Sequence, residues 1–277
     1  MSKFLLICTV CTMYIDFIKA NQCGPIKSFF CEASEPCPDT NTFIIIEVDD
    51  TFRYWAQNYH NYLRNEFAGG SDCRFKSGWT AANMLLVEYD LELEKSVECA
   101  LKKCPFVYNE CRRNKQFGYL GQNLYKCIGD DAELLLYTAA LLWKEELLEI
   151  IQNDLSIMKH FHNVKGKTIE HVTQLLWAET SHIGCAKARD PYNNDHYLAC
   201  HYGPSGNMYH EPVFIQGNPR SKCSSGYWRQ STRYPNLCSN QTNEEDLRNA
   251  SSNFYLTFYY LCIMFCVNVI AMGTIDI

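Results

Sequence analysis

Two stretches in the second half of the chain decide its fold. The first is HVTQLLWAET at residues 171–180, followed by GCA at residues 184–186, and the second is YLACHYGPSGNM at residues 197–208. The first stretch predicts a short helix. GCA and the beginning of the second stretch each lie in an apolar run bounded by polar turn residues, which is typical of a β-strand.

The two predicted strands carry one cysteine each. We expect the strands over Gly184–Ala188 and His196–Tyr202, with Cys185 in the first and Cys200 in the second. The intervening Asn193–Asn194 pair suits a turn, because asparagine side chains bond to nearby backbone and tolerate turn conformations. A hairpin of this kind makes a cross-strand disulfide natural.

Three further helices are predicted earlier in the chain. Asp49 or Asp50 is a suitable N-cap for a helix that ends at Gly69–Gly70. Asp90 is expected to cap a second helix, and a third is expected from about Asp131 to Asn153.

The two opening stretches resemble the first and second signatures of the CAP superfamily, which comprises cysteine-rich secretory, antigen 5 and pathogenesis-related proteins. The second signature matches at each constrained position, and the first departs at Val172, where the family usually has an aromatic residue. HNYLR at residues 60–64 is similar to the HN-x-x-R motif of the family's first helix. The run Cys104–Cys111, GQNL at residues 121–124 and YPNLC at residues 234–238 resemble insect venom allergen 5 proteins in particular.

The resemblance covers roughly residues 22–239 and implies a fold. That fold is an α+β fold: a three-layer α-β-α sandwich around a small antiparallel sheet, stapled by disulfides. The structural residues of the matched motifs are His60, Asn61, Arg64, Trp177 and Asn207. The family also implies Cys185–Cys200 and Cys223–Cys238 bridges, with Cys104 and Cys111 reaching back to the N-terminal cysteines.

The family's central cleft often holds two histidines and two glutamates, and this chain keeps half of that set. The matching positions are Tyr108, Gln122, Glu146 and His171. Tyrosine and glutamine are neutral at pH 7 and are poor zinc ligands, so no metal and no other cofactor is expected. Glu146 and His171 could form a general acid–base pair. Alternatively, they hydrogen-bond to each other and hold the cleft together. No activated nucleophile accompanies them, which favours the second interpretation and a protein that is not an enzyme.

The cysteines and the two chain ends indicate an extracellular protein. Sixteen cysteines suit an oxidising compartment. Met1–Ala20 has one early lysine and then an apolar run, as in a signal peptide. We expect one CAP domain over residues 21–238, a polar stalk over residues 239–252 and a hydrophobic tail over residues 253–277. Twelve cysteines lie outside the two apolar ends, enough for six bridges.

The C-terminal tail is expected to tether the protein. Asn249–Ile275 carries no charged side chain, and Phe254–Met272 is long enough to cross a bilayer. No lysine or arginine follows the run, which favours a cleaved GPI signal, and a transmembrane helix is the alternative. Asn240 and Asn249 begin glycosylation sequons.

The expected function is binding at the cell exterior. The net charge of −6 gives no basic footprint for nucleic acid. The resemblance implies a small lipid, a sterol or an extracellular protein as partner, and the chain is expected to be a monomer. The apolar residues Leu134–Leu148 could line a lipid groove, although a helix core explains most of them. Two alternatives stay open: a weak metal-dependent hydrolase that uses Glu146 and His171, and a purely adhesive surface protein.

Overall fold

The computed structural model describes residues 43–72, 79–103, 112–128, 135–193 and 195–240. Contacts divide the chain into two units, each built from several separate segments. Unit 1 comprises residues 1–53, 89–135 and 182–205, and unit 2 comprises residues 54–88, 136–181 and 206–277. The elements in chain order are β1 (Ile44–Ile46), α2 (Asp50–Ala68), β2 (Glu88–Tyr89), α3 (Leu91–Lys103), β3 (Arg113–Asn114), β4 (Gly118–Tyr119), β5 (Gly121–Ile128), α4 (Leu135–Glu145), α5 (Leu147–Asn153), the 3-10 helix η1 (Leu155–Met158), α6 (Glu170–Leu175), β6 (His182–Arg189), β7 (Asp195–Gly203), β8 (Arg229–Gln230) and β9 (Cys238–Ser239).

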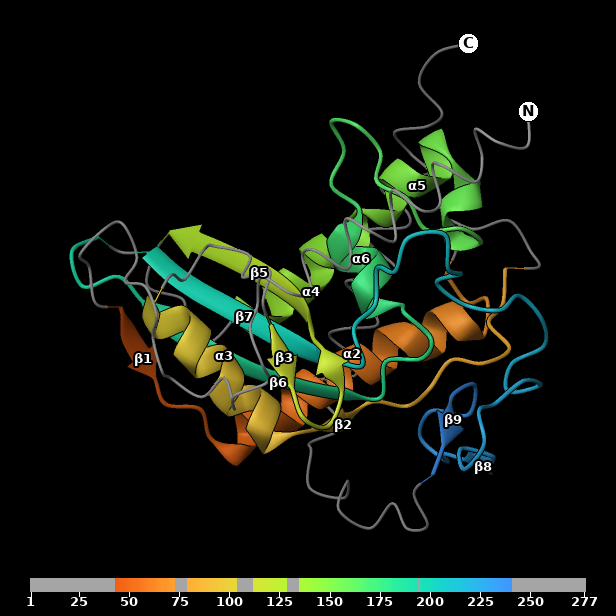
Figure 1. Ribbon diagram of the computed structural model, residues 1–277, viewed down its shortest axis with the longest axis horizontal. Coiled ribbons are helices and arrows are strands. Elements are labelled where there is room, and N and C mark those ends of the chain that lie inside the picture. The colour runs from red at the N-terminus through yellow and green to blue at the C-terminus, as the bar shows by residue number, and fades with distance from the viewer. Residues whose placement is uncertain (1–42, 73–78, 104–111, 129–134, 194, 241–277) are drawn as a thin grey trace, which may run out of the picture. The chain divides into compact units, whose positions relative to one another are not determined.

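Unit 1 contains an antiparallel sheet of order β1-β6-β7-β5 (Figure 1). The short β2 pairs with β6. β6 and β7 are the two strands that the sequence predicts, each slightly longer than expected. Cys185 lies directly opposite Cys200 in the register, and the two form a disulfide. The predicted hairpin and its bridge are therefore confirmed.

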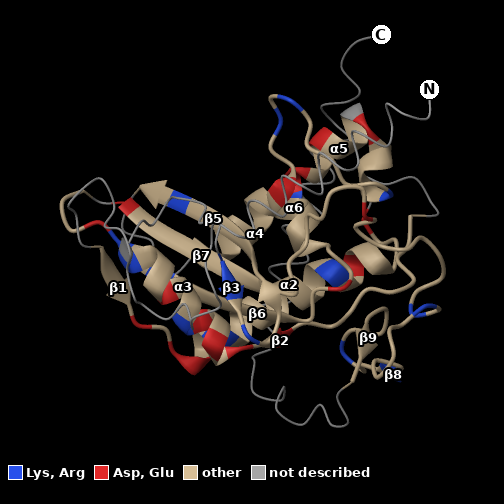
Figure 2. Cartoon of the chain, viewed as in Figure 1, with Lys and Arg blue, Asp and Glu red and all other residues tan. Residues whose placement is uncertain are grey.

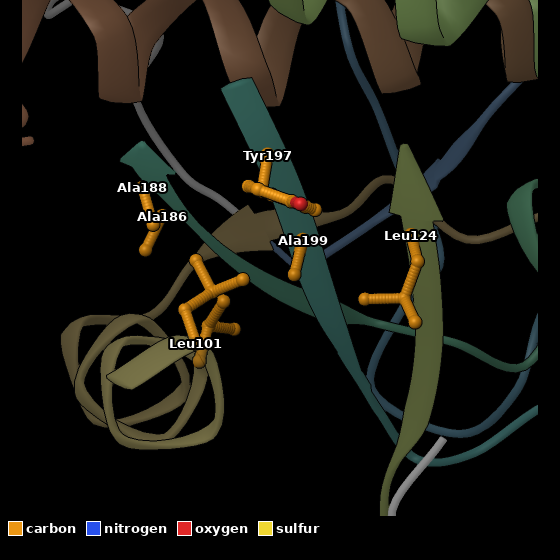
Figure 3. Close-up of a cluster of buried hydrophobic side chains, with 7 residues drawn as sticks. Leu101, Leu124, Ala186, Ala188, Tyr197 and Ala199 are labelled. Atoms are coloured by element: carbon orange, nitrogen blue, oxygen red, sulfur yellow. The ribbon is translucent and has the colours of Figure 1, made fainter. Parts of the chain in front are cut away.

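Helix α3 packs on one face of this sheet, against β6, β7 and β1. The buried side chains between helix and sheet alternate with residues of the other face, as the two-residue period of a strand requires. In Figure 3, Leu101 of α3 lies close to the alanines of β6 and β7, with Leu124 on β5. The members of this cluster are Val97, Leu101, Leu124, Ala186, Ala188, Tyr197 and Ala199. Small alanines on the two central strands let the helix lie close to the sheet.

Gly184 sets how closely α3 approaches β6. A Cβ atom at this position would lie 2.6 Å from the carbonyl carbon of Leu93 and 2.7 Å from the carbonyl oxygen of Asp90. These are backbone atoms that no rotamer change can move away. Asp90 is also the cap that the sequence predicts, since its carboxylate accepts a hydrogen bond from the Leu93 N–H at 2.8 Å. The capped start of α3 and the missing side chain of Gly184 therefore both determine the contact between α3 and β6.

The first long helix, α2, begins and ends as predicted. The Asp49 carboxylate accepts a hydrogen bond from the Phe52 N–H at 2.8 Å, which satisfies one of the unpaired donors at the helix start. At the other end Gly70 adopts a φ of 71°, a conformation that glycine reaches at little cost.

The prediction of one helix over residues 131–153 is wrong. The chain forms α4 up to Glu145 and a separate α5 from Leu147. Glu146 stands at the break as the N-cap residue of α5, although its side chain makes no capping bond there. Its carboxylate instead accepts hydrogen bonds from His171 and Val172 of α6. Apolar periodicity continues across the break, which is why the sequence predicts a single helix.

Several predictions fall on residues that the structure does not describe. They include the signal peptide, most of the stalk and the tail, together with Tyr108, Cys104, Cys111, Asn194 and Asn249. Within the described ranges, no helix is both long enough and apolar enough to span a bilayer. Asn240, the first sequon residue, is exposed.

Two buried histidines should make the protein acid-sensitive. Burial and the positive charge of Arg112 lower the pKa of His201 to about 3, and burial lowers that of His60 to about 4. Both values lie below the 6.5 of an ordinary histidine. The unfolded chain therefore binds more protons than the folded one below pH 6.5. The free energy of unfolding should fall by roughly 1.4 kcal/mol per pH unit for each histidine between pH 6.5 and 5.

Urea titrations at pH 7, 6 and 5 measure this slope. His201→Gln should reduce the slope, whereas His160→Gln, at an exposed histidine, should leave it unchanged. Equal slopes in the His201→Gln variant and the native protein would contradict the assignment.

Candidate functional site

Arg64 is the most highly bonded residue of the matched motifs. It stands on α2, is 1% exposed and points its guanidinium into the interior of unit 2. It donates to backbone carbonyl oxygens at 2.7–3.2 Å, which a planar fork of five N–H donors suits. The accepting residues are Leu85, Leu175, Trp177, Ala178 and Thr180. Arg64 therefore ties α2 to residues 85 and 175–180.

Its neighbours on α2 have comparable structural roles. The Asn61 side chain pairs with the backbone of Val87 twice, donating to the carbonyl at 2.9 Å and accepting from the N–H at 2.8 Å. His60 is 1% exposed, and its Nδ1 lies 2.7 Å from the Ala56 carbonyl oxygen within the same helix. The interpretation of His60 as a packing histidine, and not a ligand, agrees with this geometry.

Residues of the second signature stretch contact α6 and the residues that follow it. Asn207 has a φ of 57°, and its side-chain amide donates to the Glu170 carbonyl and accepts from the Thr173 hydroxyl, each at 2.7 Å. Gly206 lies against the Trp177 side chain, where an added Cβ would come within 2.7 Å of the ring. The two signature stretches therefore hold each other in place.

Glu146 and His171 come together, as the family resemblance implies. The His171 Nδ1 lies 2.5 Å from Glu146 Oε1. A carboxylate can only accept, so the ring donates from Nδ1. The indole of Trp143 stacks on the imidazole, with 5.9 Å between ring centres and an angle of 12° between the planes. Both the carboxylate and the imidazole are mostly buried.

The other carboxylate oxygen of Glu146 caps α6. Glu146 Oε2 accepts hydrogen bonds from the backbone N–H groups of His171 and Val172 at 3.0 and 3.1 Å. These donors lie in the first turn of α6, where a helix leaves N–H groups unsatisfied. The N-cap residue itself is Ile169, which has no side-chain acceptor. Glu146 therefore supplies from 25 residues away the cap that α6 lacks locally.

Gln122 belongs to unit 1 and has a cationic neighbour. Its amide oxygen accepts a hydrogen bond from Arg112 Nη1 at 2.9 Å, and Arg112 Nε donates to the Leu120 carbonyl. The residue is 8% exposed. A guanidinium beside this amide makes the position unfavourable for a cation.

The chain was compared with known proteins. Its residues 57–202 match the model of the cysteine-rich secretory protein family, CAP. It is 33% identical to scoloptoxin SSD43 of Scolopendra dehaani over 69% of this chain and 86% of that protein. It is 31% identical to venom allergen 3 of Solenopsis invicta over 74% of this chain and 90% of that protein. Among solved structures it resembles NaASP2, crystallised with Zn2+, with a TM-score of 0.53 and 27% identity over 73% of this chain and 100% of that chain.

The chain belongs to the CAP family, and its fold is the α+β fold of that family. This confirms the resemblance from the signature stretches. The relatives carry the names of venom allergens and toxins, in agreement with the antigen 5 features of the sequence.

The donor set described here does not fit a tight zinc site. Both oxygens of Glu146 are engaged by His171 and Val172, and Gln122 faces an arginine. Across the described ranges, no three or more His, Cys, Asp and Glu side chains are grouped so that they could hold a metal ion. We therefore derive no chemistry through a metal.

Two partners of the predicted residues are not among those that the motifs single out. Trp143 stacks on His171, and Arg112 donates to Gln122. A second network was also missed: the Glu94 carboxylate accepts two hydrogen bonds from Arg53, at 2.8 and 2.9 Å, and one from the Tyr89 hydroxyl. No sequence spacing pairs these residues.

Arg64→Lys should destabilise the protein strongly. An ammonium has three donors, so at least two of the five carbonyls lose their bond to this side chain. Each lost bond costs about 1–1.5 kcal/mol, and a loss of about 3 kcal/mol in the free energy of unfolding is expected. Urea denaturation followed by tryptophan fluorescence measures it. Arg189→Lys, at an exposed arginine, is the matched control, and an equal loss there would contradict the role of Arg64.

Glu146→Ala should cost about 1–2 kcal/mol, the usual effect of removing a helix cap. Glu146→Gln keeps an oxygen acceptor for the two N–H groups and should lose clearly less. Thermal and urea unfolding of both variants measure the difference. Glu211→Ala removes an exposed carboxylate and should change stability by less than about 0.5 kcal/mol. If the alanine variant matched this control, the capping role of Glu146 would be refuted.

Proposed function

We propose that this protein is an extracellular binding module without catalytic activity. The observation that carries the proposal is the use of Glu146. One carboxylate oxygen caps α6, and the other accepts from His171. A general base must be able to reach a proton of the substrate, and these contacts commit the carboxylate to the fold.

The surroundings of His171 support the same conclusion. Its ring is stacked on Trp143 and tied to Glu146 through Nδ1. In a catalytic triad a carboxylate orients a histidine in a similar way, but the histidine then faces a nucleophilic Ser or Cys. Here the same carboxylate also accepts hydrogen bonds from the backbone N–H groups of His171 and Val172. The pair therefore serves better as a brace for α6 than as an acid–base couple.

The names of the relatives support the extracellular location. Proteins named as venom allergens and scoloptoxins align over 69–82% of this chain. The disulfides Cys185–Cys200 and Cys223–Cys238 suit an oxidising compartment. Whether the C-terminal tail tethers the protein to a membrane is part of the proposal.

A small lipid is the ligand that the resemblance implies, and the structure narrows where it could bind. Leu135, Leu136 and Leu147 are at most 4% exposed and belong to the core. Leu141 is half-buried, and Leu142 is 50% exposed. A lipid that touches α4 would therefore meet the side bearing Leu141 and Leu142 and not the whole leucine run.

A native mass spectrum of the chain secreted from insect cells tests the binding role. We expect excess mass that matches a lipid and leaves on denaturation, with less of it in Leu142→Gln. Fluorogenic ester and peptide substrates, with and without zinc, should show no turnover above that of the His171→Ala variant. Metal-dependent turnover that disappears in His171→Ala but persists in His160→Ala would overturn the proposal. A bare protein without catalysis would exclude the lipid and leave a protein partner.

A further inference from the structure

The C-terminal part of unit 2 is basic, in contrast to the rest of the chain. Residues 212–240, here called the basic segment, contain four cations and no Asp or Glu. The cations are Arg220, Lys222, Arg229 and Arg233. The whole chain has a net charge of −6, so the residues outside this segment carry −10. Figure 2 shows blue and no red on the ribbon that carries β8 and β9.

The fold holds these cations near one another. Arg229 begins β8, which pairs with β9, and Cys238 of β9 forms a disulfide with Cys223 beside Lys222. Arg220 Nη2 donates to the Trp228 carbonyl at 3.3 Å, directly before Arg229. Arg220, Lys222 and Arg229 therefore all lie on or next to the disulfide-linked pair of strands β8 and β9.

Several cations elsewhere in the chain are paired with carboxylates. Elsewhere Arg53, Lys95, Lys126, Lys144 and Lys167 each lie within 4 Å of a carboxylate. In the described part of the chain, Arg220, Lys222 and Arg229 form no ion pair. One carboxylate that contacts the segment, Glu179, accepts hydrogen bonds from Ser224 and Asn83. Lys222 and Arg229 are exposed and can meet an external anion.

Arg220 is also held in an unfavourable state. Its φ is 62°, a region that a non-glycine residue seldom adopts. Its buried Nε has no hydrogen-bond partner in the described ranges. An isolated fold gains nothing from either feature, and such features gather where a protein binds something. The guanidinium of Arg233 is likewise fixed, 5.6 Å from the rings of both Tyr54 and Tyr234.

One aromatic ring stands among these charges. Trp228 is 68% exposed and precedes Arg229, while the neighbouring Ser225, Gln230 and Thr232 are exposed and polar. A membrane-binding surface needs several apolar side chains that enter the lipid together, which this face does not offer. One flat ring beside several cations instead suits a sugar ring that carries anionic groups.

We propose that the face formed by Arg220, Lys222, Trp228 and Arg229 binds a sulfated polysaccharide. Guanidinium and ammonium groups pair with sulfate oxygens, and the indole packs on the apolar face of a sugar ring. Basic clusters of this kind are typical of heparin-binding patches. The inference rests on the proposed extracellular binding role and names one partner class for it.

Isothermal titration of the full secreted chain with a heparin-derived dodecasaccharide at 50 and 150 mM NaCl tests the proposal. Binding should weaken with salt, as expected for release of counterions. Lys222→Ala/Arg229→Ala should weaken binding on the order of tenfold and flatten the salt dependence. Trp228→Ala should weaken binding about threefold without changing the salt dependence, because it removes no charge. De-sulfated heparin should not bind.

Lys115→Ala/Lys165→Ala is the matched control, because it removes the same charge from two exposed lysines outside the segment. Its affinity should stay within about twofold of the native protein. An equal loss in both double variants, or no heparin binding at all, would overturn the proposal. Binding to phosphatidylserine vesicles but not to heparin would overturn it as well and assign the face to a membrane. Thermal unfolding verifies that each variant folds. None of these outcomes bears on the turnover and native-mass tests of the proposed function, so the two can fail separately.

Discussion

The buried guanidinium of Arg64 is the interaction on which unit 2 depends. Burying a charge is unfavourable unless it is fully bonded, and here backbone carbonyls from residues 85 and 175–180 provide the bonds. Residues 176–180 lie in turns and coil after α6, and some of their carbonyls also accept a backbone hydrogen bond, as Ala178 does from Leu85. The arginine adds further bonds to this irregular part of the core and joins it to α2. This is why one α2 residue can fix segments more than 100 positions away in the sequence.

Glu146 likewise satisfies backbone groups that would otherwise stay unpaired, here the N–H groups of α6. A short helix such as α6 has many unsatisfied N–H groups for its length, and its own N-cap residue is an isoleucine. A carboxylate from the break between α4 and α5 satisfies two of them and turns His171 against Trp143. Of the family's two histidines and two glutamates this chain thus keeps one of each, and their hydrogen bonds serve the fold. The loss of the other two ligand types, at Tyr108 and Gln122, agrees with that change.

Local signals predicted the parts of the fold that local physics determines. The aspartate caps of α2 and α3 and the β6–β7 hairpin with its disulfide are confirmed, because each depends on residues close in sequence. β5 was missed: its first four residues are all buried, so it shows no alternation, and its partner β7 lies about 70 residues away. The single helix over 131–153 failed because apolar periodicity continues through the break at Glu146, which the sequence does not mark. The Glu146–His171 pair came from the resemblance, whereas the stacking of Trp143 on His171 and the bond from Arg112 to Gln122 exist only in the folded chain.

Polar residues in the interior and cations in the basic segment differ in how far their hydrogen-bonding groups are already occupied. This difference explains where a partner can bind. In the interior, Arg64, Asn61 and Glu146 have their hydrogen-bonding groups engaged by backbone atoms, which leaves little capacity for a ligand. In the basic segment the situation is reversed, because Lys222 and Arg229 are exposed and Arg220 keeps a buried Nε without an acceptor in the described ranges. A disulfide, buried Leu237 and Cys238, and backbone hydrogen bonds between Cys238 and residues 84 and 86 hold this hairpin in place. Exposed residues on such an anchored hairpin can carry charge at the surface without weakening the fold, so recognition is better placed there than at the Glu146–His171 pair.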